Sequence, residues 1–123
     1  RLIFIDNVMN YGFCFLGGFG GKIGAQISGI YTGGEFYVMA FEFSGDYEFA
    51  DASLILAFYD ENGRVMHMDI MENQTVASGE YVFTGDFDAS TADTFKLFIW
   101  NGAERLKPLD TVKAFDMAMY VME

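Results

Sequence analysis

SLILAFYDENGRVMHMDIM, residues 53–71, decides the fold of this chain. Apolar residues recur at alternate positions on both sides of a polar tetrad, Asp60–Gly63. Such alternation is typical of β-strands, and Asn-Gly between two strand-like runs is a strong hairpin signal because both residues tolerate positive φ. The stretch therefore predicts two antiparallel strands, 52–59 and 64–71, joined by a tight turn.

The second of these strands has two distinct rows of side chains. We expect its core-facing row to be Met66, Met68 and Ile70. The opposite row contains His67 and Asp69, which we expect to face solvent. Because side chains alternate with a period of two, a slip of one residue would bury both polar residues.

The same alternation predicts further strands along the chain. They cover residues 1–5, 11–16, 22–31, 35–43, 80–87 and 94–100. Residues 44–51, 72–79 and 88–93 are polar connections. The last segment, 110–123, matches both a strand and a helix, and a strand that closes the sheet is favoured. About nine short strands separated by turns indicate one all-β domain over residues 1–123, an antiparallel two-sheet β-sandwich.

The composition is that of a folded, acidic domain. Hydrophobic residues make up 52% of the 123 residues and aromatic residues 18%, a content that disordered chains lack. The formal net charge is −11, from 18 acidic and 7 basic residues. A surface this acidic repels phosphate backbones and anionic lipids, so we expect no nucleic-acid partner. No apolar run approaches the ~18 residues of a membrane span, so we expect no membrane insertion.

The glycine-rich segment GGFGGKIG, residues 17–24, invites comparison with a phosphate-binding loop. Leu16 stands where that loop needs its first Gly, and Ile23 stands where it needs Ser or Thr for the metal. The segment is therefore interpreted as a hairpin or bulged loop. The single cysteine, Cys14, excludes an internal disulfide and a Cys-based zinc cluster, and we expect it to be a small buried hydrophobe.

Residues that could carry catalysis are few. His67 is the only histidine; it is expected on the surface, with no nucleophile near it in sequence, so no catalytic site is predicted. Carboxylates occur in close pairs at Asp86/Asp88, Asp60/Glu61 and Asp46/Glu48. Nothing else indicates a glycosidase. No cofactor or metal site is predicted, although loops rich in Asp leave Ca²⁺ as a candidate ion.

A ligand-binding role is considered for three aromatic residues. Trp100, the only tryptophan, shares a strand face with Lys96 and Phe98, and Tyr59 and Tyr47 are expected near it. A planar aromatic strip stacks on sugar rings, which makes these residues candidates for carbohydrate binding. The alternative is that Trp100 packs beneath the chain that returns at residues 107–109.

Four short stretches in this order resemble a known kind of domain: LILAFYDENGRV at 54–65, Gly79-Glu80, TADTFKLFIW at 91–100 and LKPL at 106–109. They are similar to an immunoglobulin-like or fibronectin-III-like β-sandwich found in secreted and cell-surface multidomain proteins of Gram-positive bacteria. The matching segments span residues 54–109, about half of the chain, and exclude the first 35 residues.

The resemblance implies a noncatalytic accessory module that is secreted or displayed at the cell surface. Such a module acts as a structural spacer, and its partners are neighbouring domains of the parent chain. The alternative is a carbohydrate-binding module that holds a polysaccharide with exposed aromatic side chains. The resemblance brings no catalytic residues with it.

Overall fold

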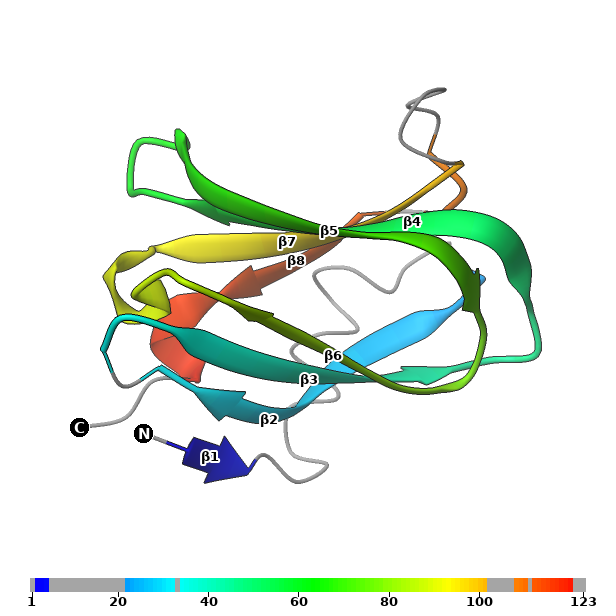
Figure 1. The fold of residues 1–123 in the computed structure, drawn as a ribbon, viewed down its shortest axis with the longest axis horizontal. Helices are drawn as coiled ribbons and strands as arrows, with labels where there is room; N and C mark the ends of the chain where they lie inside the picture. The colour runs from blue at the N-terminus through cyan, green and yellow to red at the C-terminus, as the bar shows by residue number, and fades with distance from the viewer. Residues whose placement is uncertain (1, 5–21, 33, 102–107, 111, 121–123) are drawn as a thin grey trace.

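Two β-sheets face each other in the computed structural model of this protein (Figure 1). The structure describes residues 2–4, 22–32, 34–101, 108–110 and 112–120. The predicted strand at 11–16, the buried position of Cys14 and most of the glycine-rich segment lie outside these residues.

Each sheet has four antiparallel strands. Their bounds are β1 (Leu2–Phe4), β2 (Gly24–Tyr31), β3 (Tyr37–Ser44), β4 (Phe49–Tyr59), β5 (Val65–Val76), β6 (Gly79–Gly85), β7 (Thr94–Trp100) and β8 (Lys113–Asp116). One sheet has the order β1-β2-β3-β6 and the other β5-β4-β7-β8. The predicted all-β, antiparallel, two-sheet sandwich is confirmed.

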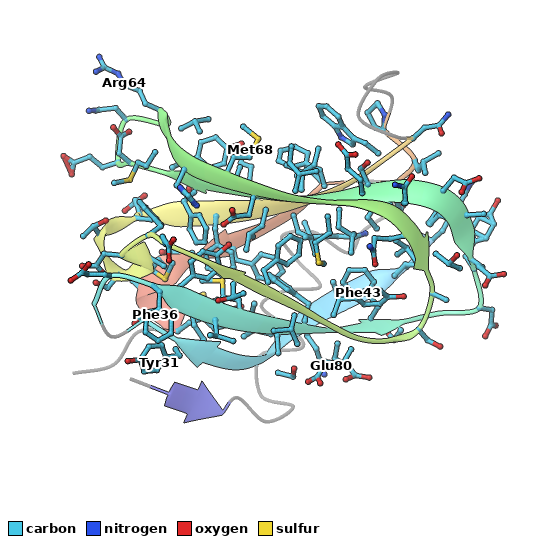
Figure 2. All side chains as sticks on the ribbon, in the orientation of Figure 1. Tyr31, Phe36, Phe43, Arg64, Met68 and Glu80 are labelled. Carbon is cyan, nitrogen blue, oxygen red and sulfur yellow. The ribbon has the colours of Figure 1, made fainter. Side chains whose placement is uncertain are left out.

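Alternate side chains of the inner strands build the core between the sheets. On β4 the inward row is Leu54, Leu56 and Phe58, all fully buried. On β3 the inward residues include Phe41, whose ring lies 5.9 Å from that of Phe83 on β6. Figure 2 shows Phe43 of β3 between the two sheets. Alternate positions thus separate the inward row of each strand from its outward row.

The predicted hairpin turn at Asp60–Gly63 is present. The Gly63 N–H donates to the Asp60 carbonyl, and the Asp60 carboxylate accepts from the N–H groups of Asn62 and Arg64. Gly63 has a φ of 80°, whereas Asn62 stays at negative φ. The turn therefore needs glycine at one position only, and the hydrogen bonds to the Asp60 carboxylate fix the backbone of its other residues.

The predicted facing of the next strand is wrong. Met66, Met68 and Ile70 point away from the other sheet and are 40%, 47% and 48% exposed. His67 and Asp69 point inward and are partly buried. Their partners on β4 explain this facing, because His67 lies opposite Phe58, which faces the core. β5 is an edge strand, so its inner row still reaches water and accepts polar residues.

Three predicted boundaries also differ from the structure. β4 begins at Phe49, inside the polar connection that was expected at residues 44–51. β5 continues to Val76, into the connection that was expected at residues 72–79. The C-terminal segment is a strand, as favoured, but β8 ends at Asp116. A 3₁₀ helix, Met117–Met119, follows it, and the Asp116 carboxylate caps that helix by accepting from the Ala118 N–H. Within the described residues, no helix has the length and apolar character needed to cross a bilayer.

Candidate functional site

An apolar hollow opens on the outer face of the β5-β4-β7-β8 sheet. It has a volume of about 230 Å³. Side chains from three adjacent strands line it: Ile55, Ala57 and Tyr59 of β4, Met68 of β5, and Phe98 and Trp100 of β7. The hollow therefore lies across the centre of the sheet, on the face that is not packed against the other sheet.

The small side chain of Ala57 accounts for the hollow. Ala57 lies between Met68 on β5 and Lys96 on β7, and each of these neighbours has a much longer side chain. Ile55 and Ala57 are buried although they face outward, because the surrounding side chains cover them. The hollow thus has a short, apolar floor and taller walls.

Aromatic rings make up most of the walls. The rings of Phe98 and Trp100 lie 5.6 Å apart at 73°, an edge-to-face arrangement. The two rings therefore do not form one flat strip. The Lys96 ammonium lies 4.9 Å from the centre of the Tyr59 ring, a cation–π contact. Burial raises the pKa of the Tyr59 hydroxyl above its ordinary value.

The structure brings together two of the three predicted ligand-binding residues. Trp100 and Tyr59 line the same hollow. Tyr47 is not among the residues of that hollow; it precedes β4, and its ring lies 4.9 Å from that of Phe49. Tyr47 is 42% exposed and is covered from one side by the Lys22 ammonium, 4.6 Å from its ring.

The alternative to a ligand site was that Trp100 packs beneath the chain at residues 107–109. Trp100 does contact that segment, through its backbone. Its backbone forms an isolated antiparallel bridge with Pro108. The Leu109 N–H donates to the Ile99 carbonyl at 2.8 Å. The indole itself is only partly buried and contributes to the hollow. The backbone of this strand end is therefore structural, while its side chain is left at the surface.

Sequence reasoning missed Ala57 and Met68 as members of this site. Alternation separates Ala57 from the row of Leu54, Leu56 and Phe58, but nothing in the sequence indicates that it forms the floor of a hollow. Met68 was assigned to the core. One signal could have indicated the hollow. Ala57 is a small residue in the middle of a strand, and the residues opposite it on the adjacent strands have long side chains.

A second cluster lies at the inner side of β5, around His67. Its Nε2 lies 2.9 Å from Asp69 Oδ2, and the Tyr37 hydroxyl of β3 donates to the same oxygen at 2.5 Å. The His67 ring stacks on Phe87, with centroids 4.7 Å apart and planes 4° from parallel. The expectation of a surface histidine that faces outward is therefore wrong.

The chemistry of this cluster is that of a partly buried polar contact. Burial is the main cause that raises the pKa of Tyr37, and the hydrogen bond to Asp69 raises it further. A histidine held by a carboxylate resembles half of a catalytic triad. Among the hydrogen bonds of the described residues, none joins His67 to a Ser, Thr or Cys side chain. The arrangement joins the two sheets, because Tyr37 and Asp69 belong to different ones.

The acidic loops line two other hollows. One, of about 340 Å³, is bordered by Asp60, Glu61 and Asp93; another, of about 580 Å³, is bordered by Glu35 and Asp86. Across the part of the chain that the structure describes, no three His, Cys, Asp or Glu side chains are grouped as metal ligands would be. Asp60 is occupied by the hairpin turn.

A buried ion pair lies at the opposite end of β8 from its 3₁₀ helix. Lys113 Nζ is 3.4 Å from Asp110 Oδ2, and both side chains are almost fully buried. Asp110 also accepts the backbone N–H groups of Lys22 and Ile23, at 2.9 to 3.1 Å. Burial lowers the pKa of Lys113, and the Asp110 charge opposes this shift. The pair therefore fixes the entry of β2 against β8.

Comparison with known proteins does not place this chain in a family. No family profile matches the sequence, and no curated protein matches it with significance. The function is therefore argued from the site alone.

Proposed function

We propose that this protein is a noncatalytic accessory module of an extracellular multidomain protein, where it positions neighbouring domains. The single observation that carries this proposal is the apolar hollow on the outer face of the β5-β4-β7-β8 sheet. No other described element covers this sheet face, and a face of that kind normally carries polar side chains. An apolar outer face is a contact surface for another protein segment.

The order of the strands supports an immunoglobulin-like or fibronectin-III-like interpretation. In that interpretation, β2, β3 and β6 correspond to strands A, B and E, and β4, β7 and β8 correspond to C, F and G. β5 then takes the place of C′, which joins the C-F-G sheet in variable-type domains. Modules of this architecture are built to be joined end to end in large exported proteins, as the sequence resemblance implies.

The lining of the hollow favours a protein partner over a sugar. Sites for polar ligands combine apolar walls with placed hydrogen-bonding groups. Of the residues that line the hollow, only Tyr59 and Trp100 carry a polar side-chain atom. A neighbouring domain that inserts one apolar side chain needs no such groups, and the volume of about 230 Å³ is sufficient for one.

Carbohydrate binding is the second candidate, and a specific observation supports it. Trp100 and Tyr59 border one hollow, with Lys96 beside them as a hydrogen-bond donor. A single sugar ring could stack on one of these aromatic faces. The edge-to-face packing of Phe98 on Trp100 limits the platform to one ring at a time.

Hydroxyl-radical footprinting separates these functions. In the parent polypeptide, Phe98 and Trp100 should be several-fold less reactive than in the isolated domain, because a neighbouring domain covers them. Met119, which is 43% exposed and outside the hollow, is the internal control and should react equally in both. Equal reactivity of Trp100 in both samples would contradict the positioning role.

The second candidate is tested by retardation of the isolated domain in gels that contain cell-wall or plant polysaccharides. Retardation that disappears in Trp100→Ala and persists in Tyr47→Ala would replace the first proposal with the second. Tyr47 is a suitable control because it is exposed and outside the hollow.

A further inference from the structure

A lysine borders the apolar hollow on the outer face of the β5-β4-β7-β8 sheet. Lys96 lies opposite Ala57, the floor of the hollow, in the pairing of β7 with β4. Its side chain is partly buried, and its ammonium lies 4.9 Å from the centre of the Tyr59 ring, which forms a wall. The cation–π contact therefore places a positive charge at the rim of the hollow, at its Tyr59 end.

This positive charge has no counter-ion within the part of the chain that the structure describes. The chain has 18 acidic residues against 7 basic ones, so carboxylates are plentiful. No ion pair between described residues includes Lys96. The side chains that line the hollow are all uncharged. The ammonium of Lys96 is therefore available to a carboxylate that a partner supplies.

The other polar groups at the hollow also donate hydrogen bonds. The indole N–H of Trp100 can only donate, and the Tyr59 hydroxyl can donate as well as accept. Of the side chains that line the hollow, only Tyr59 has an oxygen atom. A sugar offers hydroxyl donors that need acceptors, whereas an ionised carboxylate only accepts. The donor set therefore matches a carboxylate beside an apolar group better than it matches a sugar.

We propose that the hollow receives a segment of a neighbouring domain in which an apolar side chain lies next to an Asp or Glu. The apolar side chain enters the hollow, and the carboxylate accepts from the Lys96 ammonium at its rim. The partner's charge rests on the positioning role proposed above and makes it more specific. Lys96 is then a specificity-determining residue, because a Lys or Arg at the same place in the partner would be repelled.

The net charge of −11 opposes an acidic partner at long range. Repulsion between distant charges is screened by salt, with a Debye length of about 8 Å at 0.15 M. A carboxylate in contact with Lys96 is closer than this length, so its attraction is reduced less. The preference for a carboxylate is therefore measured at physiological salt, where the local contact outweighs the distant charges.

Titration of the full chain with three capped peptides, GFDG, GFNG and GFKG, tests the charge. The peptides share an apolar side chain and differ in the residue next to it. Trp100 is the only tryptophan, so its single indole ¹⁵N–¹H resonance reports binding at the hollow. GFDG should bind about three to five times more tightly than GFNG, and GFKG most weakly. Equal affinities overturn the proposal, as does the absence of GFDG binding at millimolar concentration.

Substitutions show whether Lys96 is the source of the preference. Lys96→Gln should lower the affinity for GFDG to that for GFNG, while Lys96→Arg should keep the preference. Figure 2 shows Arg64 at the tip of the β4–β5 hairpin, away from Met68, which borders the hollow. Arg64→Gln is therefore the matched control and should also keep the preference. A preference for GFDG that survives Lys96→Gln overturns the proposal.

The place of binding is tested by filling the hollow. Ala57→Leu extends the floor into the hollow and should abolish binding of all three peptides. Far-ultraviolet circular dichroism checks that each variant is folded. Undiminished binding of GFDG to a folded Ala57→Leu variant overturns the proposal. Glucuronate, a carboxylate on a polar ring, should leave the Trp100 resonance unchanged. A shift at lower concentrations than with GFDG would assign the hollow to an acidic polysaccharide and overturn a protein partner.

Footprinting of Trp100 separates the partner's charge from the positioning role itself. If Trp100 is protected in the parent polypeptide while the three peptides bind alike, the positioning role stands and the carboxylate requirement is overturned. If GFDG is preferred while Trp100 reacts equally in the parent polypeptide and the isolated domain, the carboxylate preference stands and the positioning role is overturned.

Discussion

Tyr37 and Asp69 join the two sheets of the sandwich through one hydrogen bond, from the Tyr37 hydroxyl to the Asp69 carboxylate at 2.5 Å. Tyr37 lies on β3 and Asp69 on β5, so the bond crosses the interior near the border of the molecule. Asp69 also holds His67, whose ring covers Phe87. The polar side of β5 is therefore anchored inward, which leaves Met66, Met68 and Ile70 at the surface.

Tyr37→Phe is expected to destabilise the domain by about 1 to 2 kcal/mol, because a partly buried carboxylate loses its donor while the ring packing on Phe58 remains. Urea denaturation at neutral pH measures the change in the free energy of unfolding. Tyr47→Phe removes a hydroxyl at an exposed position and should change it by less than about 0.5 kcal/mol. Equal effects of the two substitutions would contradict a structural role for the bond between the sheets.

Gly85→Ala is expected to disturb the same contact from β6. A Cβ at Gly85 would overlap Asp69 Oδ2 and would lie 3.0 Å from Tyr37 Cε1. We expect a loss of about 2 kcal/mol, because Asp69 must move away from Tyr37. In the Tyr37→Phe background the same substitution should cost less, since the hydrogen bond is already absent. Additive effects in this double-mutant cycle would show that the two residues act independently.

The sequence was sufficient for the central strands and misleading for the edge. In β4, Leu54, Leu56 and Phe58 face the core as alternation predicts, since a central strand is covered on its inner side along its whole length. In β5, alternation found the two rows but not their direction. The rule that apolar rows face inward fails there because the inner row is only half buried and satisfies its polar groups through Tyr37.

The part of the candidate site that lies on β7 was predictable from the sequence. Period-two alternation places Lys96, Phe98 and Trp100 on one face, and their partial burial agrees with this. The contact between Tyr37 and Asp69 joins residues 32 positions apart on different sheets. Such a contact depends on how the sheets are stacked, which no local pattern encodes.

Asp110→Asn is expected to cost about 3 kcal/mol, because the buried Lys113 ammonium loses the Asp110 charge 3.4 Å away. Lys113→Met should cost less, about 1 kcal/mol, since Asp110 keeps the N–H donors of Lys22 and Ile23. Thermal and urea unfolding of both variants measure the difference. Should Lys113→Met prove the more damaging of the two, the ion pair would not be the reason that Asp110 is needed.

Stability is expected to fall steeply at alkaline pH because of Tyr120. Burial, with a further contribution from the Asp116 charge, raises its pKa to about 12, against 10.0 for the free side chain. Between these two values the unfolded chain loses the phenolic proton while the folded chain keeps it. Unfolding is therefore favoured as pH rises, and the contribution lost by pH 12 is about 2 kcal/mol.

Tyr120→Phe should remove this part of the pH dependence, since the variant has no proton to lose at that position. Urea midpoints measured from pH 9 to pH 11.5 give the slope for both proteins. The variant should show a shallower decline, with a remaining decline from Tyr37 and Tyr59, whose pKa values are also raised by burial. Parallel curves for wild type and Tyr120→Phe would mean that Tyr120 titrates alike in the folded and unfolded chain.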